Sequence, residues 1–149
     1  MVICLFGESC TGKSTIAEQL KKKVDAKVFT GKDYIKLAKN EDEAKKQFIE
    51  LLKHNETTSE VLIYVVSEKE HLALLPEKTI RVLLTAELDV IKERFSKRMN
   101  GKMPAPVAKM LESKHRMFNS EKHDLHIHGV DGDIDEICEK IYSLIPPGK

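Results

Sequence analysis

Eight residues near the amino end of the chain, Gly7 to Ser14, have the types and the spacing that bind phosphate. They read GESCTGKS and match the pattern G-x-x-x-x-G-K-[ST] of a phosphate-binding loop. Glycines let such a loop curl, so that backbone N–H groups point at phosphate oxygens, and the positive end of the following helix adds its attraction. The pattern predicts that Lys13 reaches the β- and γ-phosphates of a nucleoside triphosphate and that the Ser14 hydroxyl binds Mg²⁺. The expected nucleotide site is the run Gly7, Glu8, Ser9, Cys10, Thr11, Gly12, Lys13, Ser14 and Thr15.

A second group of residues suited to phosphate chemistry follows Leu84-Thr85-Ala86-Glu87. Arg94 and Arg98 are four residues apart and therefore share one face of a helix, and Lys97 and Lys102 extend the basic stripe. Guanidinium groups offer rigid, forked donors to the charge that accumulates during phosphoryl transfer. We expect Arg94 and Arg98 to be catalytic residues. A basic lid that could close over the substrate is expected over about 95–118, a segment that contains the helix-breaking residues Pro104 and Pro106. The alternative is an ordinary solvated amphipathic helix.

An acceptor for the phosphoryl group is expected beside Thr30-Gly31-Lys32-Asp33-Tyr34, within a segment of about 30–55. Asp33 has a carboxylate that orients or deprotonates an acceptor hydroxyl, and Lys32 and Lys36 attract an anionic acceptor. The predicted acceptor-binding residues are Asp33, Tyr34 and Lys36. The alternative is a helix N-terminus, which by itself favours Asp, with a solvated charge pair.

Two further features lie at the ends of other predicted strands. Glu68 follows an apolar run and is a candidate to hold a magnesium-bound water. His126 and His128 alternate with apolar residues and so share one face, but no Cys or third His has metal-ligand spacing beside them. We therefore expect neutral histidines there, and a loop over 130–133 that receives the adenine ring through backbone contacts.

The elements that position these residues alternate between short β-rich runs and longer helical patterns. That alternation predicts an α/β fold in which a doubly wound parallel sheet has helices on both faces. Strands are expected over 1–6, 27–29, 61–66, 80–84 and 125–128, and helices over 13–23, 33–39 and 42–53. Asn40 with Glu43 three residues later is typical of a helix start.

Composition indicates one domain over residues 1–149 and no polymeric partner. Lys and Arg number 25 against 24 for Asp and Glu, which gives a formal net charge of +1, so neither a nucleic acid polymer nor a membrane surface is expected as a partner. The three cysteines, Cys4, Cys10 and Cys138, lack metal-ligand spacing and are expected to be reduced thiols. No apolar run approaches the length of a membrane span. We expect a cytoplasmic protein.

Taken together, these segments resemble the nucleoside monophosphate kinases, and most closely the cytidylate kinase-like group. Residues 7–15 resemble the ATP-binding loop of that group, Thr30-Gly31-x-x-Tyr34 its T-G-x-x-Y turn, and Leu84-Thr85-Ala86 with Arg94 and Arg98 its L-T-A strand end and lid arginines. The resemblance implies a P-loop kinase-type sheet of five parallel strands in the order 2-3-1-4-5 with a small helical lid. It also implies ATP and Mg²⁺ as cosubstrates and transfer of the γ-phosphoryl group to a nucleoside monophosphate.

The acceptor half of the chain departs from that group. Ile35 stands where the group has an Arg, with Lys36 one place later, and Ser67-Glu68-Lys69 replaces its G-R-D segment. Two alternatives therefore stay open: a small-molecule kinase that resembles shikimate or gluconate kinases, and an ATP-binding module without transfer activity. A signalling GTPase is less expected, because the sequence lacks the D-x-x-G and N-K-x-D motifs.

Overall fold

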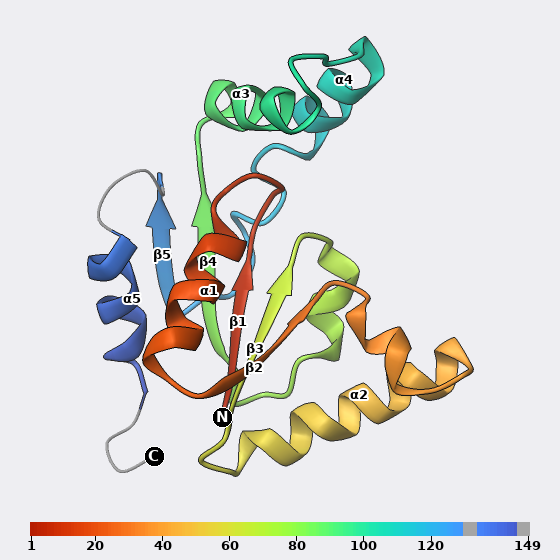
Figure 1. Ribbon diagram of the computed structural model, residues 1–149, viewed down its shortest axis with the longest axis vertical. Coiled ribbons are helices and arrows are strands. Elements are labelled where there is room, and N and C mark those ends of the chain that lie inside the picture. Colours follow the sequence, from red (N-terminus) through yellow and green to blue (C-terminus); the bar gives the residue numbers. More distant parts are fainter. Residues whose placement is uncertain (130–133, 146–149) are drawn as a thin grey trace.

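The protein is described from a computed structural model, which places residues 1–129 and 134–145 and shows a five-stranded, wholly parallel sheet in the order β2-β3-β1-β4-β5 (Figure 1). The strands are β1 (Val2–Phe6), β2 (Ala26–Thr30), β3 (Val61–Val66), β4 (Ile80–Thr85) and β5 (Leu125–His128). This order confirms the predicted 2-3-1-4-5 arrangement. In the register, Phe6 of β1 lies opposite Val66 of β3 and Leu83 of β4, so the central strands end together. The loops that leave them emerge at one edge of the sheet.

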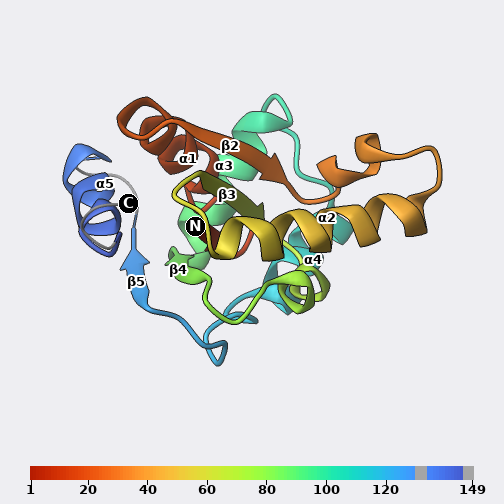
Figure 2. The ribbon, with the colours of Figure 1, turned by 90° about the horizontal axis from the view of Figure 1, so that it is seen from below.

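Helices cover both faces of the sheet, as predicted (Figure 2). The helices are α1 (Lys13–Lys23), α2 (Glu41–Glu56), α3 (Leu88–Arg98), α4 (Ala105–Lys114) and α5 (Ile134–Tyr142), with two 3₁₀ helices, η1 (Asp33–Leu37) and η2 (Lys69–Leu74). Ile16 and Leu20 of α1 pack with Ile141 of α5 on one face. Phe48 and Leu52 of α2 pack on the other face. None of the described helices is long and apolar enough to cross a membrane.

The chain between β2 and α2 confirms one local prediction and corrects another. The Asn40 side chain caps α2 by accepting a hydrogen bond of 3.1 Å from Glu43 N, which confirms the predicted helix start. The helix predicted over 33–39 is instead the short 3₁₀ helix η1. The stretch between the end of β2 and the cap at Asn40 leaves room for one tight turn only.

Helices α3 and α4 lie beyond the edge of the sheet at which the loop after β1 emerges, and they include much of the predicted lid over about 95–118 (Figure 1). The Nζ of Lys92 lies 2.5 Å from the Glu112 carboxylate and joins the two helices. Pro106, predicted to break a helix, lies in the first turn of α4. A proline is tolerated there because the N–H it lacks has no partner within the helix. Ile91 of α3 and Leu111 of α4 share a small apolar cluster with Cys10, so the lid packs directly on the phosphate loop.

Candidate active site

The loop of residues 7–12 joins β1 to α1 and depends on two glycines. Gly12 has a φ of 97° and starts α1, and Cys10 has a φ of 65°, so the backbone turns sharply twice before the helix. A Cβ at Gly7 would lie 2.1 Å from the carbonyl oxygen of Leu84, which no side chain tolerates. Gly7 N also donates a 3.1 Å hydrogen bond to Val66 O. The loop is therefore seated on the ends of both strands that flank β1.

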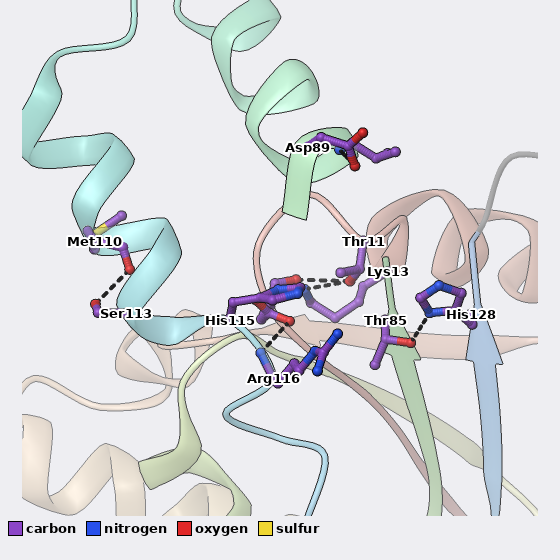
Figure 3. Close-up of polar contacts among 11 residues, drawn as sticks. Thr11, Lys13, Thr85, Asp89, Met110, Ser113, His115, Arg116 and His128 are labelled. Carbon is purple, nitrogen blue, oxygen red and sulfur yellow. Dashed lines mark hydrogen bonds and ion pairs between the residues drawn. The ribbon is translucent and has the colours of Figure 1, made fainter. Parts of the chain in front are cut away.

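Lys13, the first residue of α1, lies buried under this loop (Figure 3). Its Nζ donates to Glu8 O at 2.5 Å and lies 3.4 Å from Thr11 Oγ1, which itself donates to Glu8 O at 2.9 Å. The pKa of Lys13 is lowered from 10.5 to about 8, mainly by burial; the positive charge of Arg98 acts in the same direction, and Cys10 and Glu8 act against it. A buried ammonium group of this kind is stabilised by an anion, which is what a triphosphate would supply.

The Glu8 side chain connects the phosphate loop to the residues that follow α4. Its carboxylate is buried, lies 3.0 Å from His115 Nδ1 and accepts a 3.2 Å hydrogen bond from Arg116 N. Figure 3 shows His115 and Arg116 beside Lys13. These two residues were not predicted as part of the site. They lie 107 and 108 positions from Glu8 in the sequence, and a contact at that separation cannot be predicted from a local motif.

The structure brings both predicted lid arginines to the phosphate loop. Arg94 Nη1 donates a 3.1 Å hydrogen bond to Cys10 O. Arg94 and Arg98 also line a cavity of about 330 Å³ with Lys97 and with residues of the loop and α1. The remaining lining residues are Cys10, Gly12, Thr15 and Ile134. The side chains of Arg94, Lys97 and Arg98 thus gather at one cavity beside the loop that is predicted to bind phosphate.

The predicted magnesium residues come from two different elements. Ser14 is exposed in the first turn of α1, next to buried Lys13. Glu68 follows β3; its side chain is 51% exposed, and one carboxylate oxygen lies 3.4 Å from Lys114 Nζ at the end of the lid. A hydroxyl and a free carboxylate oxygen are hard ligands that suit Mg²⁺, which otherwise keeps water and phosphate oxygens.

The predicted acceptor residues have three different surroundings. The Asp33 carboxylate accepts a 3.0 Å hydrogen bond from Thr30 N, and Lys36 is exposed. Tyr34 is buried, and its ring stacks on Phe48 with 5.3 Å between ring centroids. Tyr34 also lines a cavity of about 140 Å³ whose other lining residues are Lys32, Glu41, Asp42, Lys45, Glu70, His71 and Leu74. The structure thus places a polar cavity between the predicted acceptor segment and η2, with Tyr34 in its wall; Asp33 and Lys36 are not among its lining residues.

The two histidines of β5 lie on one face, as their alternation indicates, and both contact Thr85. Thr85 Oγ1 lies 2.8 Å from His126 Nε2 and 2.7 Å from His128 Nδ1, and His128 Nε2 lies 3.0 Å from a Glu87 oxygen. Burial lowers the pKa of His126, which favours its neutral form. Within residues 1–129 and 134–145, no group of three or more His, Cys, Asp or Glu side chains is arranged to hold a metal ion. The loop over 130–133, predicted to receive adenine, lies outside the described residues.

Comparison with known proteins identifies the fold. No protein-family model matches the sequence, and neither does any curated protein. Among solved structures, shikimate kinase from Aquifex aeolicus is 21% identical, with a TM-score of 0.59 over 97% of this chain and 95% of that chain. The YorR protein of Bacillus subtilis, solved with phosphorylated GDP, is 23% identical, with a TM-score of 0.63 over 97% and 95% of the two chains.

A third structure, the tunicamycin resistance protein of Deinococcus radiodurans, is 19% identical, with a TM-score of 0.65 over 98% of each chain. At such identities the likeness concerns the fold alone. None of these three structures is described as a cytidylate kinase, so the particular resemblance to the cytidylate kinase-like group stays a prediction. The chain has the fold of the shikimate kinase-like P-loop proteins.

Proposed function

We propose that this protein transfers the γ-phosphoryl group of ATP to a small acceptor molecule. The observation that carries the proposal is the buried ammonium group of Lys13, held under a sharply curled loop at the start of a helix. Two arginines of the lid lie at the same loop. A burial that lowers the pKa of a lysine is unfavourable for folding and is typical of a group that binds a charged ligand.

The roles of the residues follow from phosphoryl-transfer chemistry. The loop N–H groups and Lys13 bind the β- and γ-phosphates and hold the donor in line with the acceptor. An acceptor oxygen forms a bond to the γ-phosphorus while the bond to the β–γ bridging oxygen breaks, and ADP leaves. Where the acceptor oxygen belongs to a hydroxyl, its proton is proposed to pass to the Asp33 carboxylate. Arg94 and Arg98 stabilise the charge that develops on the transferred group. Bound Mg²⁺ would neutralise charge on the phosphate oxygens, and Ser14 and Glu68 are the residues proposed to hold it.

The cavity of about 330 Å³ is proposed to receive the nucleoside part of the donor. Its wall combines the guanidinium groups of Arg94 and Arg98 with the apolar side chain of Ile134. A guanidinium plane stacks on a heterocyclic ring and also binds phosphate, so one arginine can serve both parts of a nucleotide. The proposed donor site therefore runs from this cavity, across the loop, to Lys13.

The finer proposal is that the acceptor is a nucleoside monophosphate, as the resemblance of the sequence implies. A hydroxylated metabolite is the second candidate, and the size of the acceptor cavity favours it. About 140 Å³ accommodates one ring of a small molecule, so the sugar and phosphate of a nucleotide would have to lie outside it. An ATP-binding module without transfer activity is the third possibility to test.

Release of ADP tests these alternatives directly. Purified protein would be incubated with ATP and Mg²⁺ and with CMP, UMP, AMP, GMP, shikimate or gluconate, with Lys13→Met as the inactive control and Lys21→Met as a matched exposed lysine. The proposal expects acceptor-dependent ADP release by the wild type and by Lys21→Met. Binding of ATP without ADP release for any acceptor would identify a binding module, and equal ADP release by Lys13→Met would refute the proposed site.

A further inference from the structure

His71 is a buried histidine that the proposed chemistry does not use. It lies in η2, just after β3, and is 5% exposed. Neither Nδ1 nor Nε2 has a hydrogen-bond partner among the described residues. The Glu70 carboxylate lies 3.8 Å from Nε2, which is longer than a hydrogen bond. Both ring nitrogens are therefore unsatisfied by the protein, and because they expose almost no surface in this conformation, the ring must turn to present one of them to a ligand.

His71 forms part of the wall of the 140 Å³ acceptor cavity. Its ring lies edge-on to Tyr34, with 6.4 Å between centroids and 83° between planes. Tyr34, His71 and Leu74 are the buried residues of the cavity lining. The exposed ones are two lysines and three carboxylates, namely Lys32, Lys45, Glu41, Asp42 and Glu70. The cavity is thus a polar one, in which the two rings and one leucine that are buried are surrounded by five exposed charged side chains of both signs.

Hydrogen bonds place this cavity beside the phosphate loop. Gly31 N donates to Val65 O at 2.9 Å, and Tyr64 Oη donates to Gly31 O at 2.7 Å, so the turn before η1 is joined to the end of β3. The next strand of the sheet is β1, and Gly7 N of the phosphate loop donates to Val66 O. Because parallel strands end at one edge, a molecule in the cavity lies on the side of the loop where β2 and β3 end.

We propose that His71 is a specificity-determining residue that hydrogen-bonds an uncharged polar group of the phosphoryl acceptor inside this cavity. The inference rests on the proposed function and adds the chemistry of the acceptor to it. A neutral imidazole offers one N–H donor and one nitrogen acceptor, which match a hydroxyl group or the edge of a heterocyclic ring. Burial lowers the pKa of His71, which supports the neutral form.

The absence of partners argues against a merely structural role. A buried polar group without hydrogen bonds destabilises a fold, and an apolar side chain at this position would not carry that penalty. Residues that bind ligands commonly lower stability in this way. The charges at the entrance include both signs, so they do not select a strongly anionic group for the interior.

Two variants separate a binding role from a structural one. His71→Leu keeps a similar volume and removes both polar atoms, and His71→Gln keeps one donor and one acceptor; His54→Leu, an exposed histidine of α2, is the control. Without ligand, the melting temperature of His71→Leu is expected to equal or exceed that of the wild type by a few degrees. A clearly lower melting temperature would overturn the inference, because it would show that the ring stabilises the fold.

Kinetics and nuclear magnetic resonance test the binding itself. The probes are shikimate, which offers hydroxyl groups, and CMP, which offers a heterocyclic edge. We expect one of them to shift the His71 ring nitrogen resonances of the wild type, and His71→Leu to raise the KM for that acceptor about tenfold. The KM for ATP should not change, and His71→Gln should recover most of the loss. If only shikimate has these effects, the polar group is a hydroxyl. If only CMP has them, the polar group is the edge of a heterocyclic ring.

The outcomes distinguish failure of this inference from failure of the proposed function. If calorimetry shows that the wild type binds ATP with Mg²⁺ but neither probe shifts the His71 resonances, the role of His71 is refuted and the donor site stands. An unchanged KM for the acceptor in His71→Leu would likewise refute the role of His71 and leave the donor site standing. If the wild type does not bind ATP at all, the proposed function fails, and this inference fails with it.

Discussion

Replacement of Lys13 by Met is expected to make the protein more stable while it abolishes turnover. Burial moves the pKa of Lys13 from 10.5 to about 8. At about 1.4 kcal/mol for each pH unit, this difference means that the charged lysine lowers the free energy of unfolding by about 3 kcal/mol near neutral pH. Loss of its hydrogen bond to Glu8 offsets about 1 kcal/mol of the gain. Lys13→Met should therefore be more stable by about 2 kcal/mol.

The gain should depend on pH in a defined direction. Below pH 8, Lys13 is charged in both the folded and the unfolded chain, so the whole penalty is present. Between about 8 and 10.5 the folded wild type has lost this proton and the unfolded chain has not, so the wild type gains stability as the pH rises. Above 10.5 the advantage of Lys13→Met should disappear, because the lysine is then neutral in both states.

Urea denaturation followed by circular dichroism at several pH values measures this effect. Lys21→Met is the matched control, because Lys21 is exposed on the same helix. The control should not differ from the wild type by more than about 0.5 kcal/mol at any pH. If Lys13→Met is no more stable than the wild type near pH 7, or if its advantage persists unchanged above pH 10.5, the reasoning from the buried ammonium group is wrong.

Three further substitutions test other parts of the site. Gly7→Ala should lower the free energy of unfolding by roughly 4 kcal/mol or prevent folding, because its Cβ would lie 2.1 Å from a carbonyl oxygen of β4. Gly31→Ala, with open space around it, should lose only about 1 kcal/mol, and equal losses in urea denaturation would contradict the packing argument. Arg98→Ala should reduce kcat/KM for ATP about a hundredfold, and Lys102→Ala should not; equal effects would place Arg98 outside the site. Glu8→Gln should weaken the connection between loop and lid by about 1 kcal/mol, seen as about fivefold faster amide exchange in the lid, and unchanged exchange would show that this contact does not hold the lid.

The parts of the fold that could be predicted are those that depend on short-range patterns. The loop pattern around Lys13, each apolar strand and the cap at Asn40 each involve residues that are only a few positions apart in the sequence. Their physical causes are equally local: a glycine that permits a turn, a run that is buried on both faces, and a side chain that satisfies a helix N–H.

The acceptor side of the site could be predicted only in part, because its lining depends on which side chains the fold buries there. Tyr34 belongs to a motif, yet its ring stacks on Phe48, 14 positions later in the sequence, and whether a ring lies on the inner or outer face of a short turn depends on that partner. His71 has no motif around it, and its isolation within the cavity follows from the packing of η1, α2 and η2. The contact of Glu8 with His115 likewise needs the lid to be folded onto the loop.

The central claim is that the loop around Lys13 binds the triphosphate of ATP, and isothermal titration calorimetry tests it most directly. ATP with Mg²⁺ would be titrated near neutral pH into the wild type, Lys13→Met and Lys21→Met. Saturable binding at one site is expected for the wild type and for Lys21→Met, with binding lost in Lys13→Met. A wild type that produces no heat of binding, or a Lys13→Met variant that binds as tightly as the wild type, would contradict the claim.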